Sequence, residues 1–238
     1  MSDLRTIEVD GLRLGYETWG APGAPPLVLL HALGEDSSDW RAIAPALADR
    51  YRVYALDLRG HGRSDHPGTY SYELLRDDVL AFLDVLGLDR IVLVGHSLGA
   101  FIASLVAQEQ PRILDRLILE EGPVMSPADP PRPVPGGPGE PTPYDWRLLP
   151  AIAAQRNAPD PALWERLVAI TAPTLVIAGG PASHLPQEEL AEVADRIPGA
   201  RLVTIDAGHL VHAVRPAGFL AEVDAFLAQP GNGRRGTE

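Results

Sequence analysis

Short apolar runs recur along the chain, and they constrain its fold more than any other feature. They lie at residues 26–31, 51–57, 91–96, 117–121, 174–180 and 201–206. Segments with helical spacing separate several of them. Runs of this length are typical of strands that are buried on both faces of a sheet. Because strands that alternate with helices form a parallel sheet covered on both sides, the sequence predicts an α/β fold with a mostly parallel central sheet.

The clearest helical segment begins after Ser71 and is predicted to end at Gly87, a residue suited to a left-handed C-cap. Its apolar residues share one helical face: Leu75, Val79, Phe82, Leu83 and Leu86. Ahead of the first apolar run, residues 4–20 alternate between apolar and polar across Asp10-Gly11, a dipeptide that favours tight turns. This alternation predicts a β-hairpin that adds antiparallel strands to the edge of the sheet.

A proline-rich segment interrupts the alternation of strands and helices. Ten of the 24 prolines lie between Pro123 and Pro150, so this stretch can form neither a central strand nor a long helix. We interpret residues 123–168 as an insertion that lies over the sheet and contains two short helices. The core of the fold is then formed by residues 1–122 and 169–228, and residues 229–238 are expected to be a flexible tail.

The composition excludes several kinds of chemistry and of partner. The 238 residues carry a net charge of −12, and 45% are hydrophobic, which is typical of a soluble domain without the positive surface that nucleic acids require. The chain has no cysteine, and its 20 Lys and Arg residues are all arginine. These absences exclude thiol nucleophiles, thiolate metal sites and lysine Schiff bases.

No apolar run approaches the length of a membrane span, and the N-terminal residues lack the apolar core of a signal peptide. We therefore expect a cytoplasmic protein, monomeric or homodimeric, that binds neither membranes nor nucleic acid.

The stretch Gly95-His96-Ser97-Leu98-Gly99 lies directly after a buried run and before a helical segment. G-x-S-x-G at such a junction is the pattern of a nucleophile elbow, in which a sharp turn lifts the serine hydroxyl out of the sheet. Larger residues in place of the glycines would collide with neighbouring backbone. We interpret Ser97 as a nucleophile, with the N–H of Leu98 placed at the start of the helix to stabilise an oxyanion.

A serine nucleophile needs a base, and His209 is the best placed of the seven histidines. It follows the last apolar run, where the chain re-emerges at the same edge of the sheet as Ser97. His96 would point away from Ser97, and we interpret it as packing within the elbow. His212 suggests a metal pair with His209, but no further ligand lies within reach in the sequence, so no metal site is predicted.

Four stretches together resemble the α/β-hydrolase superfamily over nearly the whole chain. They are LVLLHALGEDSSDW (27–40), DLRGHGRSD (57–65), GHSLGA (95–100) and DAGHLVHAVRP (206–216). The resemblance implies an α/β-hydrolase fold with a catalytic pair formed by Ser97 and His209. It also implies that the proline-rich insertion is a short cap over the active site.

The loop after the third predicted strand departs slightly from the family pattern. Relatives have His-Gly-x-Gly there, whereas this chain has His31-Ala32-Leu33-Gly34. The resemblance implies that the N–H of Leu33 joins that of Leu98 in the oxyanion hole. We expect His31 to order this loop rather than to take part in the chemistry.

The position of the catalytic acid needs a separate argument. Most members of the superfamily carry it in the loop after the next-to-last strand, but here Ala182 and Ser183 stand where the acid should be. Some branches, serine lactone hydrolases among them, place the acid just after the sixth strand. The run at 117–121 ends in two glutamates at that place, and Glu121 matches the position better than Glu120.

The predicted triad is therefore Ser97, Glu121 and His209, in the chain order that the fold demands. Glu120 and Glu188 remain alternatives for the acid. The carboxylate would hold one imidazole proton, fix the tautomer of His209 and stabilise the imidazolium formed during attack.

This triad predicts a serine hydrolase that cleaves a carboxylic ester or lactone through an acyl-enzyme, without a metal or organic cofactor. A serine at the elbow argues against haloalkane dehalogenases and epoxide hydrolases, which resemble this fold but need an aspartate nucleophile. Three alternatives stay open: an acyltransferase or perhydrolase, a carbon–carbon bond hydrolase, and a non-catalytic ligand-binding homologue.

The cap and the neighbouring loops supply the candidates for substrate binding. They are mostly apolar or aromatic: Ala32, Leu33, Trp40, Met125, Tyr144, Trp146, Leu148, Leu149 and Trp164. This set predicts a small to medium apolar substrate.

Overall fold

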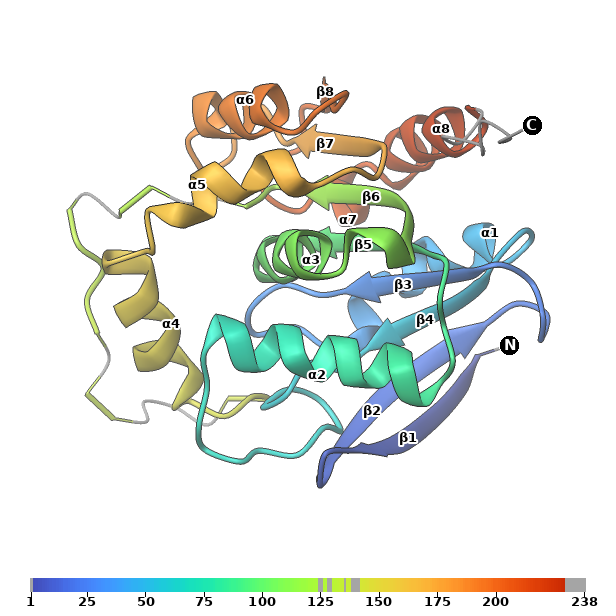
Figure 1. Ribbon diagram of the computed structural model, residues 1–238, viewed down its shortest axis with the longest axis horizontal. Helices are drawn as coiled ribbons and strands as arrows, with labels where there is room; N and C mark the ends of the chain where they lie inside the picture. Colours follow the sequence, from blue (N-terminus) through green and yellow to red (C-terminus); the bar gives the residue numbers. More distant parts are fainter. Residues whose placement is uncertain (1, 124–125, 128–129, 135, 138–141, 230–238) are drawn as a thin grey trace, which may run out of the picture.

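The computed structural model describes residues 2–123, 126–127, 130–134, 136–137 and 142–229. Its centre is an eight-stranded sheet in the order β1-β2-β4-β3-β5-β6-β7-β8 (Figure 1). The strands are β1 (Asp3–Val9), β2 (Leu12–Trp19), β3 (Pro26–Leu30), β4 (Arg52–Leu56), β5 (Ile91–His96), β6 (Leu114–Glu120), β7 (Thr174–Ala178) and β8 (Arg201–Thr204). Only the β1–β2 and β2–β4 pairings are antiparallel among these strands. The predicted α/β fold with a mostly parallel sheet is confirmed.

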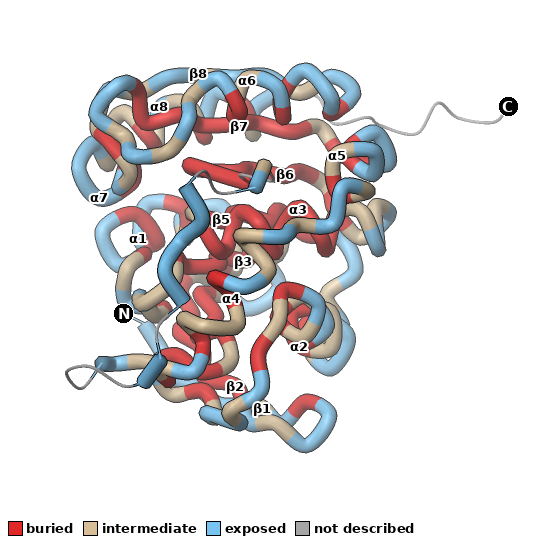
Figure 2. Tube along the Cα trace, turned by 90° about the vertical axis from the view of Figure 1, so that its left-hand side faces the viewer, coloured by how far each residue is buried: buried red, intermediate tan, exposed pale blue. Residues whose placement is uncertain are grey.

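Helices cover both faces of the sheet, which explains why the central strands are apolar at nearly every position. One core includes residues of α2 (Tyr72–Val85), α3 (Leu98–Glu109) and α6 (Gln187–Arg196). The other includes residues of η1 (Ser37–Ala42), α1 (Ala44–Leu47), α7 (Val211–Val214) and α8 (Pro216–Leu227). The central strands are accordingly buried along most of their length (Figure 2).

The hairpin and the helix predicted near the N-terminus both form. Asp10 and Gly11 make the turn between β1 and β2, with φ angles of 47° and 79°. The Ser71 side chain caps α2 by accepting a hydrogen bond from the N–H of Leu74 at 3.1 Å. Gly87 follows the helix with a φ of 65°, in the left-handed region expected of a C-cap. Among the described residues, no helix has the length and hydropathy needed to cross a bilayer.

The segment between β6 and β7 contains α4 (Leu148–Asn157), α5 (Ala162–Arg166) and η3 (Leu167–Ala169). Figure 1 shows α4 on the side of the sheet to which the arrowheads of the parallel strands point. Asp145 attaches this segment to the core, because its N–H donates to the carbonyl of Gly60 at 2.8 Å and its carboxylate accepts from Tyr70 Oη at 2.6 Å. Met125 and residues 230–238 of the expected tail lie outside the described residues.

Candidate active site

Ser97 lies in a strained turn between β5 and α3. Its φ of 53° is in the left-handed region, which residues other than glycine rarely adopt. The flanking glycines are required by space. A Cβ on Gly95 would lie 2.3 Å from the carbonyl oxygen of Gly99, and one on Gly99 would lie 2.0 Å from that of Leu30. The Ser97 side chain makes no capping hydrogen bond to α3, which leaves its hydroxyl available at the cavity described below.

Two backbone N–H groups beside Ser97 have the placement expected of an oxyanion hole. Leu98 begins α3, and Leu33 lies in the loop after β3; both line the same cavity as Ser97. Among the hydrogen bonds of the described residues, neither N–H has a partner. Unpaired N–H groups attract negative charge, and that of Leu98 also lies at a helix N-terminus, so these two donors suit a developing oxyanion.

His31 orders the loop that carries Leu33. The N–H of Leu58 donates to His31 Nε2 at 3.0 Å, so the ring proton resides on Nδ1, which donates to the carbonyl of Ala32 at 2.7 Å. The ring is fully buried, and burial lowers the pKa of His31 below its ordinary value. His31 is therefore a neutral structural histidine, which is the role expected for it.

Glu121 lies directly after β6 and contacts His209. Its Oε2 is 3.1 Å from Nδ1 of the imidazole, and the glutamate side chain is fully buried. Burial alone would raise the pKa of Glu121, but hydrogen bonds, that from His209 above all, lower it below its usual value. The carboxylate is therefore ionised at neutral pH, and it holds the Nδ1 proton of His209, which leaves Nε2 free to accept one.

Three further donors hold the Glu121 carboxylate. The N–H of Gly179 donates to Oε1 at 2.5 Å, Gln187 Nε2 donates to the same oxygen at 3.2 Å, and the Ser183 hydroxyl donates to Oε2. Ser183 stands where most relatives have the acid, and here it donates to a carboxylate from the neighbouring strand instead. These contacts of Ser183 and Gln187 could not be read from the sequence, because both depend on the pairing of β6 with β7.

A second pair of a glutamate and a histidine lies behind the first. His212 Nδ1 is 2.8 Å from Glu120 Oε2, and His212 Nε2 is 3.3 Å from Asp39 Oδ2. Burial would lower the pKa of His212, but the charges of Glu120 and Asp39 raise it to about 10. The fully buried ring is therefore a cation between two carboxylates. Trp40 stacks on it, with ring centroids 4.3 Å apart.

His96 connects this buried group to His209. Its Nε2 donates to the carbonyl oxygen of His209 at 2.8 Å, and its Nδ1 lies 3.9 Å from Asp39 Oδ2. Asp39, His96 and His212 thus present three possible ligand atoms within 4.8 Å of one another. Among the described residues, none of these three atoms has a hydrogen-bond partner. The 3.3 Å contact between Asp39 Oδ2 and His212 Nε2 is that of an ion pair.

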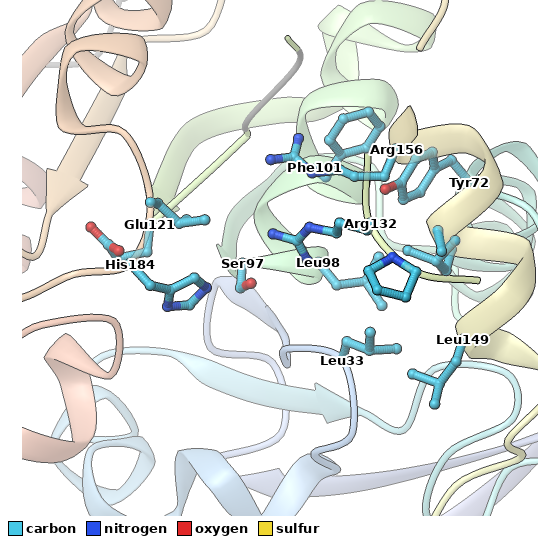
Figure 3. Close-up of a pocket in the computed structure, with 14 residues that line it drawn as sticks. Leu33, Tyr72, Ser97, Leu98, Phe101, Glu121, Arg132, Leu149, Arg156 and His184 are labelled. Carbon is cyan, nitrogen blue, oxygen red and sulfur yellow. The ribbon is translucent and has the colours of Figure 1, made fainter. Parts of the chain in front are cut away.

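A cavity of about 230 Å³ opens over Ser97 (Figure 3). Of the predicted residues, Leu33, Leu98, Glu121 and Leu149 line it together with Ser97. Sequence reasoning missed several polar and aromatic residues of its wall: Tyr72, Phe101, Arg132, Arg156 and His184. His184 packs on the His209 ring with centroids 4.3 Å apart, although His209 itself is not among the lining residues.

The structure corrects the prediction that Trp40 contacts the substrate. Trp40 is fully buried in the core on the other face of the sheet, against His212. Ala32, Tyr144 and Trp146 are not among the residues that line the cavity either. Tyr144 instead packs against His61, with ring centroids 5.8 Å apart. Leu148, which is fully buried, and Trp164 do not line it either. Met125 lies outside the described residues.

Residues 25–137 match the family model described as alpha/beta hydrolase fold. An uncharacterized protein of Mycobacterium tuberculosis is 38% identical over 112 residues, which cover 47% of this chain and 32% of that protein. The match to this relative is therefore limited to about a third of its length. The sn-1-specific diacylglycerol lipase of Mus musculus is 27% identical over 249 residues, covering 86% of this chain and 81% of the lipase.

A solved structure extends the likeness over nearly the whole chain. The enol-lactonase from Burkholderia xenovorans LB400 superposes with a TM-score of 0.77 at 27% identity, covering 94% of this chain and 100% of the lactonase. Three observations agree: the sheet order, the serine in a strained turn between β5 and α3, and the match to the family model. The chain has the α/β-hydrolase fold.

Proposed function

We propose that the protein is a serine hydrolase that cleaves a carboxylic ester or lactone of a small substrate through an acyl-enzyme. The observation that carries the proposal is the contact between the Glu121 carboxylate and His209 Nδ1, beside the cavity that Ser97 lines. The diacylglycerol lipase and the enol-lactonase, to which the chain is similar, are named for an ester and a lactone substrate.

In the proposed first half-reaction, Ser97 Oγ attacks the carbonyl carbon of the substrate while His209 Nε2 takes the hydroxyl proton. The negative charge that develops on the carbonyl oxygen is stabilised by the N–H groups of Leu33 and Leu98. Glu121 stabilises the imidazolium of His209 and keeps its ring oriented. The tetrahedral intermediate then expels the alcohol, which takes the proton from His209, and leaves an ester on Ser97.

The second half-reaction reverses these roles with water as the nucleophile. His209 removes a proton from the water, the resulting oxygen adds to the acyl carbon, and the Ser97 oxygen leaves with the proton. For a lactone, the alcohol and the acid belong to one molecule, so the product is a single hydroxy acid. The cavity of about 230 Å³ is below the roughly 300–1,000 Å³ of pockets that bury drug-sized ligands, which favours a small substrate.

Ser97→Ala tests this proposal. We expect the variant to lose at least about 10⁴-fold in kcat/KM on p-nitrophenyl acyl esters, because the attacking oxygen is gone. The rate is followed by nitrophenolate absorbance, and the fold is checked by circular dichroism. A fluorophosphonate probe should add its mass to Ser97 of the wild-type protein. Hydrolysis that survives in Ser97→Ala would refute the assignment.

A further inference from the structure

Two of the described residues that line the cavity are arginines, although the chain as a whole is acidic. The chain has a net charge of −12, yet Arg132 and Arg156 both line this cavity. Glu121 is the only carboxylate among the described lining residues, and its oxygens are already bonded by four donors. Glu121 is therefore not available as a partner for Arg132. This finding differs from the apolar pocket that the sequence predicted.

The backbone of Arg132 is fixed to α4. Its N–H donates to Asn157 Oδ1 at 2.8 Å, and its carbonyl accepts from Asn157 Nδ2 at 2.9 Å. Both bonds involve the backbone of Arg132, so its guanidinium takes no part in holding the segment to α4. Arg156 comes from α4 itself, one residue before Asn157. In Figure 3 the guanidinium nitrogens of both arginines are directed into the cavity, on the same side as Phe101.

The two guanidinium groups lie close enough to affect each other and the neighbouring rings. Burial lowers the pKa of Arg156, and the positive charge of Arg132 acts in the same direction, while Tyr72 and Glu189 oppose it. Burial also lowers the pKa of His184, with the charges of His209 and Arg132 adding to the effect. Like charges gathered in one cavity are relieved by an anion, and arginine is the side chain best suited to hold a carboxylate.

We propose that the cavity binds an acyl group that ends in a carboxylate, with Arg132 and Arg156 as the residues that hold it. This inference rests on the proposed serine hydrolase activity. The apolar side chains of Leu33, Leu149 and Ile152 line the same cavity and would contact the methylene chain between the two ends. Because Glu189 acts on Arg156, Arg132 is the residue that contributes most to the preference for an anion.

The test compares two substrates that differ only in charge. These are p-nitrophenyl hydrogen adipate, which ends in a carboxylate, and p-nitrophenyl methyl adipate, in which a methyl group masks it. Rates without enzyme are subtracted, because a carboxylate can attack its own ester. We expect kcat/KM to be at least about tenfold higher for the anionic ester, and the ratio to fall with added salt.

Arginine variants assign the preference to residues. Arg132→Gln should remove most of the advantage of the anionic ester, mainly by raising its KM, so that the ratio of kcat/KM between the two esters falls toward one. Arg156→Gln should also lower the preference for the anionic ester. Because Arg156 is half-buried, the rate of this variant on the neutral ester shows whether the substitution has disturbed the fold. Arg90→Gln is the matched control, because Arg90 is an exposed arginine beside the opposite end of β5.

Several outcomes separate the inference from the function on which it rests. Equal, Ser97-dependent rates on both esters would overturn the carboxylate site and leave the hydrolase assignment intact. Hydrolysis of neither ester would count against both proposals. If inorganic phosphate inhibits competitively and more strongly than adipate, the arginines hold a phosphate instead, and the carboxylate proposal is wrong.

Discussion

Two adjacent glutamates at the end of β6 each contact a histidine, and the two pairs differ in almost every other respect. Glu121 bonds His209, which is partly exposed at the edge of the cavity and has a second ring nitrogen free to accept a proton. Glu120 bonds His212, which is fully buried and has Asp39 on its other nitrogen. The same two functional groups therefore have an arrangement suited to a base in one place and to a buried ion pair in the other.

The difference follows from the backbone at the end of β6. Glu120 still belongs to the strand, whereas Glu121 has a φ of 50° in the left-handed region, so the two side chains diverge. A histidine with one carboxylate and one free nitrogen can exchange a proton during a reaction. A histidine that is buried between two carboxylates keeps its proton, so the role of this histidine is structural.

The largest expected effect distinguishes the two glutamates by activity. Glu121→Gln should lower kcat by roughly 10³- to 10⁴-fold, because an amide cannot stabilise the imidazolium of His209. Glu120→Gln should keep kcat within about tenfold in the molecules that remain folded. Ester hydrolysis normalised to the folded fraction measures both. The opposite ranking would mean that Glu120 is the triad acid.

The second effect distinguishes the pairs by stability. Glu120→Gln removes one of the two carboxylates that balance the buried His212 cation, so the free energy of unfolding should fall by roughly 3–5 kcal/mol. Glu192→Gln breaks the exposed pair between Glu192 and Arg196 and should cost less than about 1 kcal/mol. Urea denaturation measures both variants. A loss for Glu120→Gln no larger than that of the surface control would contradict a charged His212.

The third effect, which is spread over several pH units, is a dependence of stability on pH. The pKa of His212 is about 10 in the folded protein, above the ordinary value of 6.5. Its contribution is therefore complete below about pH 6.5 and is lost as the pH rises toward 10, at up to about 1.4 kcal/mol per pH unit. The groups that face it are Glu120, Asp39 and His96. Urea denaturation at a series of pH values should show the free energy of unfolding of the wild-type protein falling more steeply over this window than that of His212→Gln. If the two proteins lose stability in parallel, His212 does not have a raised pKa.

Much of the architecture could be predicted because it depends on local pattern. All six apolar runs contain strands of the sheet, from β3 to β8, and the hairpin and α2 begin and end near their predicted residues. Ser97, Glu121 and His209 could be named because strong motifs or strand ends mark them, and the fold brings the ends of parallel strands to one edge.

The residues that the sequence did not reveal are those whose roles depend on long-range contacts. An apolar residue such as Trp40 is compatible with either face of a sheet, and nothing in its neighbours showed that it packs against His212. Arg132 lies in a proline-rich stretch without periodicity, so only the contact with Asn157 shows which way its segment runs. Ser183 and Gln187 reach Glu121 only because β6 and β7 are neighbours.

The burial of His212 between Glu120 and Asp39 has a consequence for how such a chain can change over time. Replacing His212 alone leaves two carboxylates without a cation, and replacing Glu120 or Asp39 removes one of the two carboxylates that contact the cation. Replacing all three with apolar side chains of similar volume removes every one of these charges at once. Descendants of this sequence should therefore retain the trio or lose it as a unit. Substitutions in three segments that are distant in the sequence should therefore depend on one another: the segment before Trp40, the end of β6 and the start of α7.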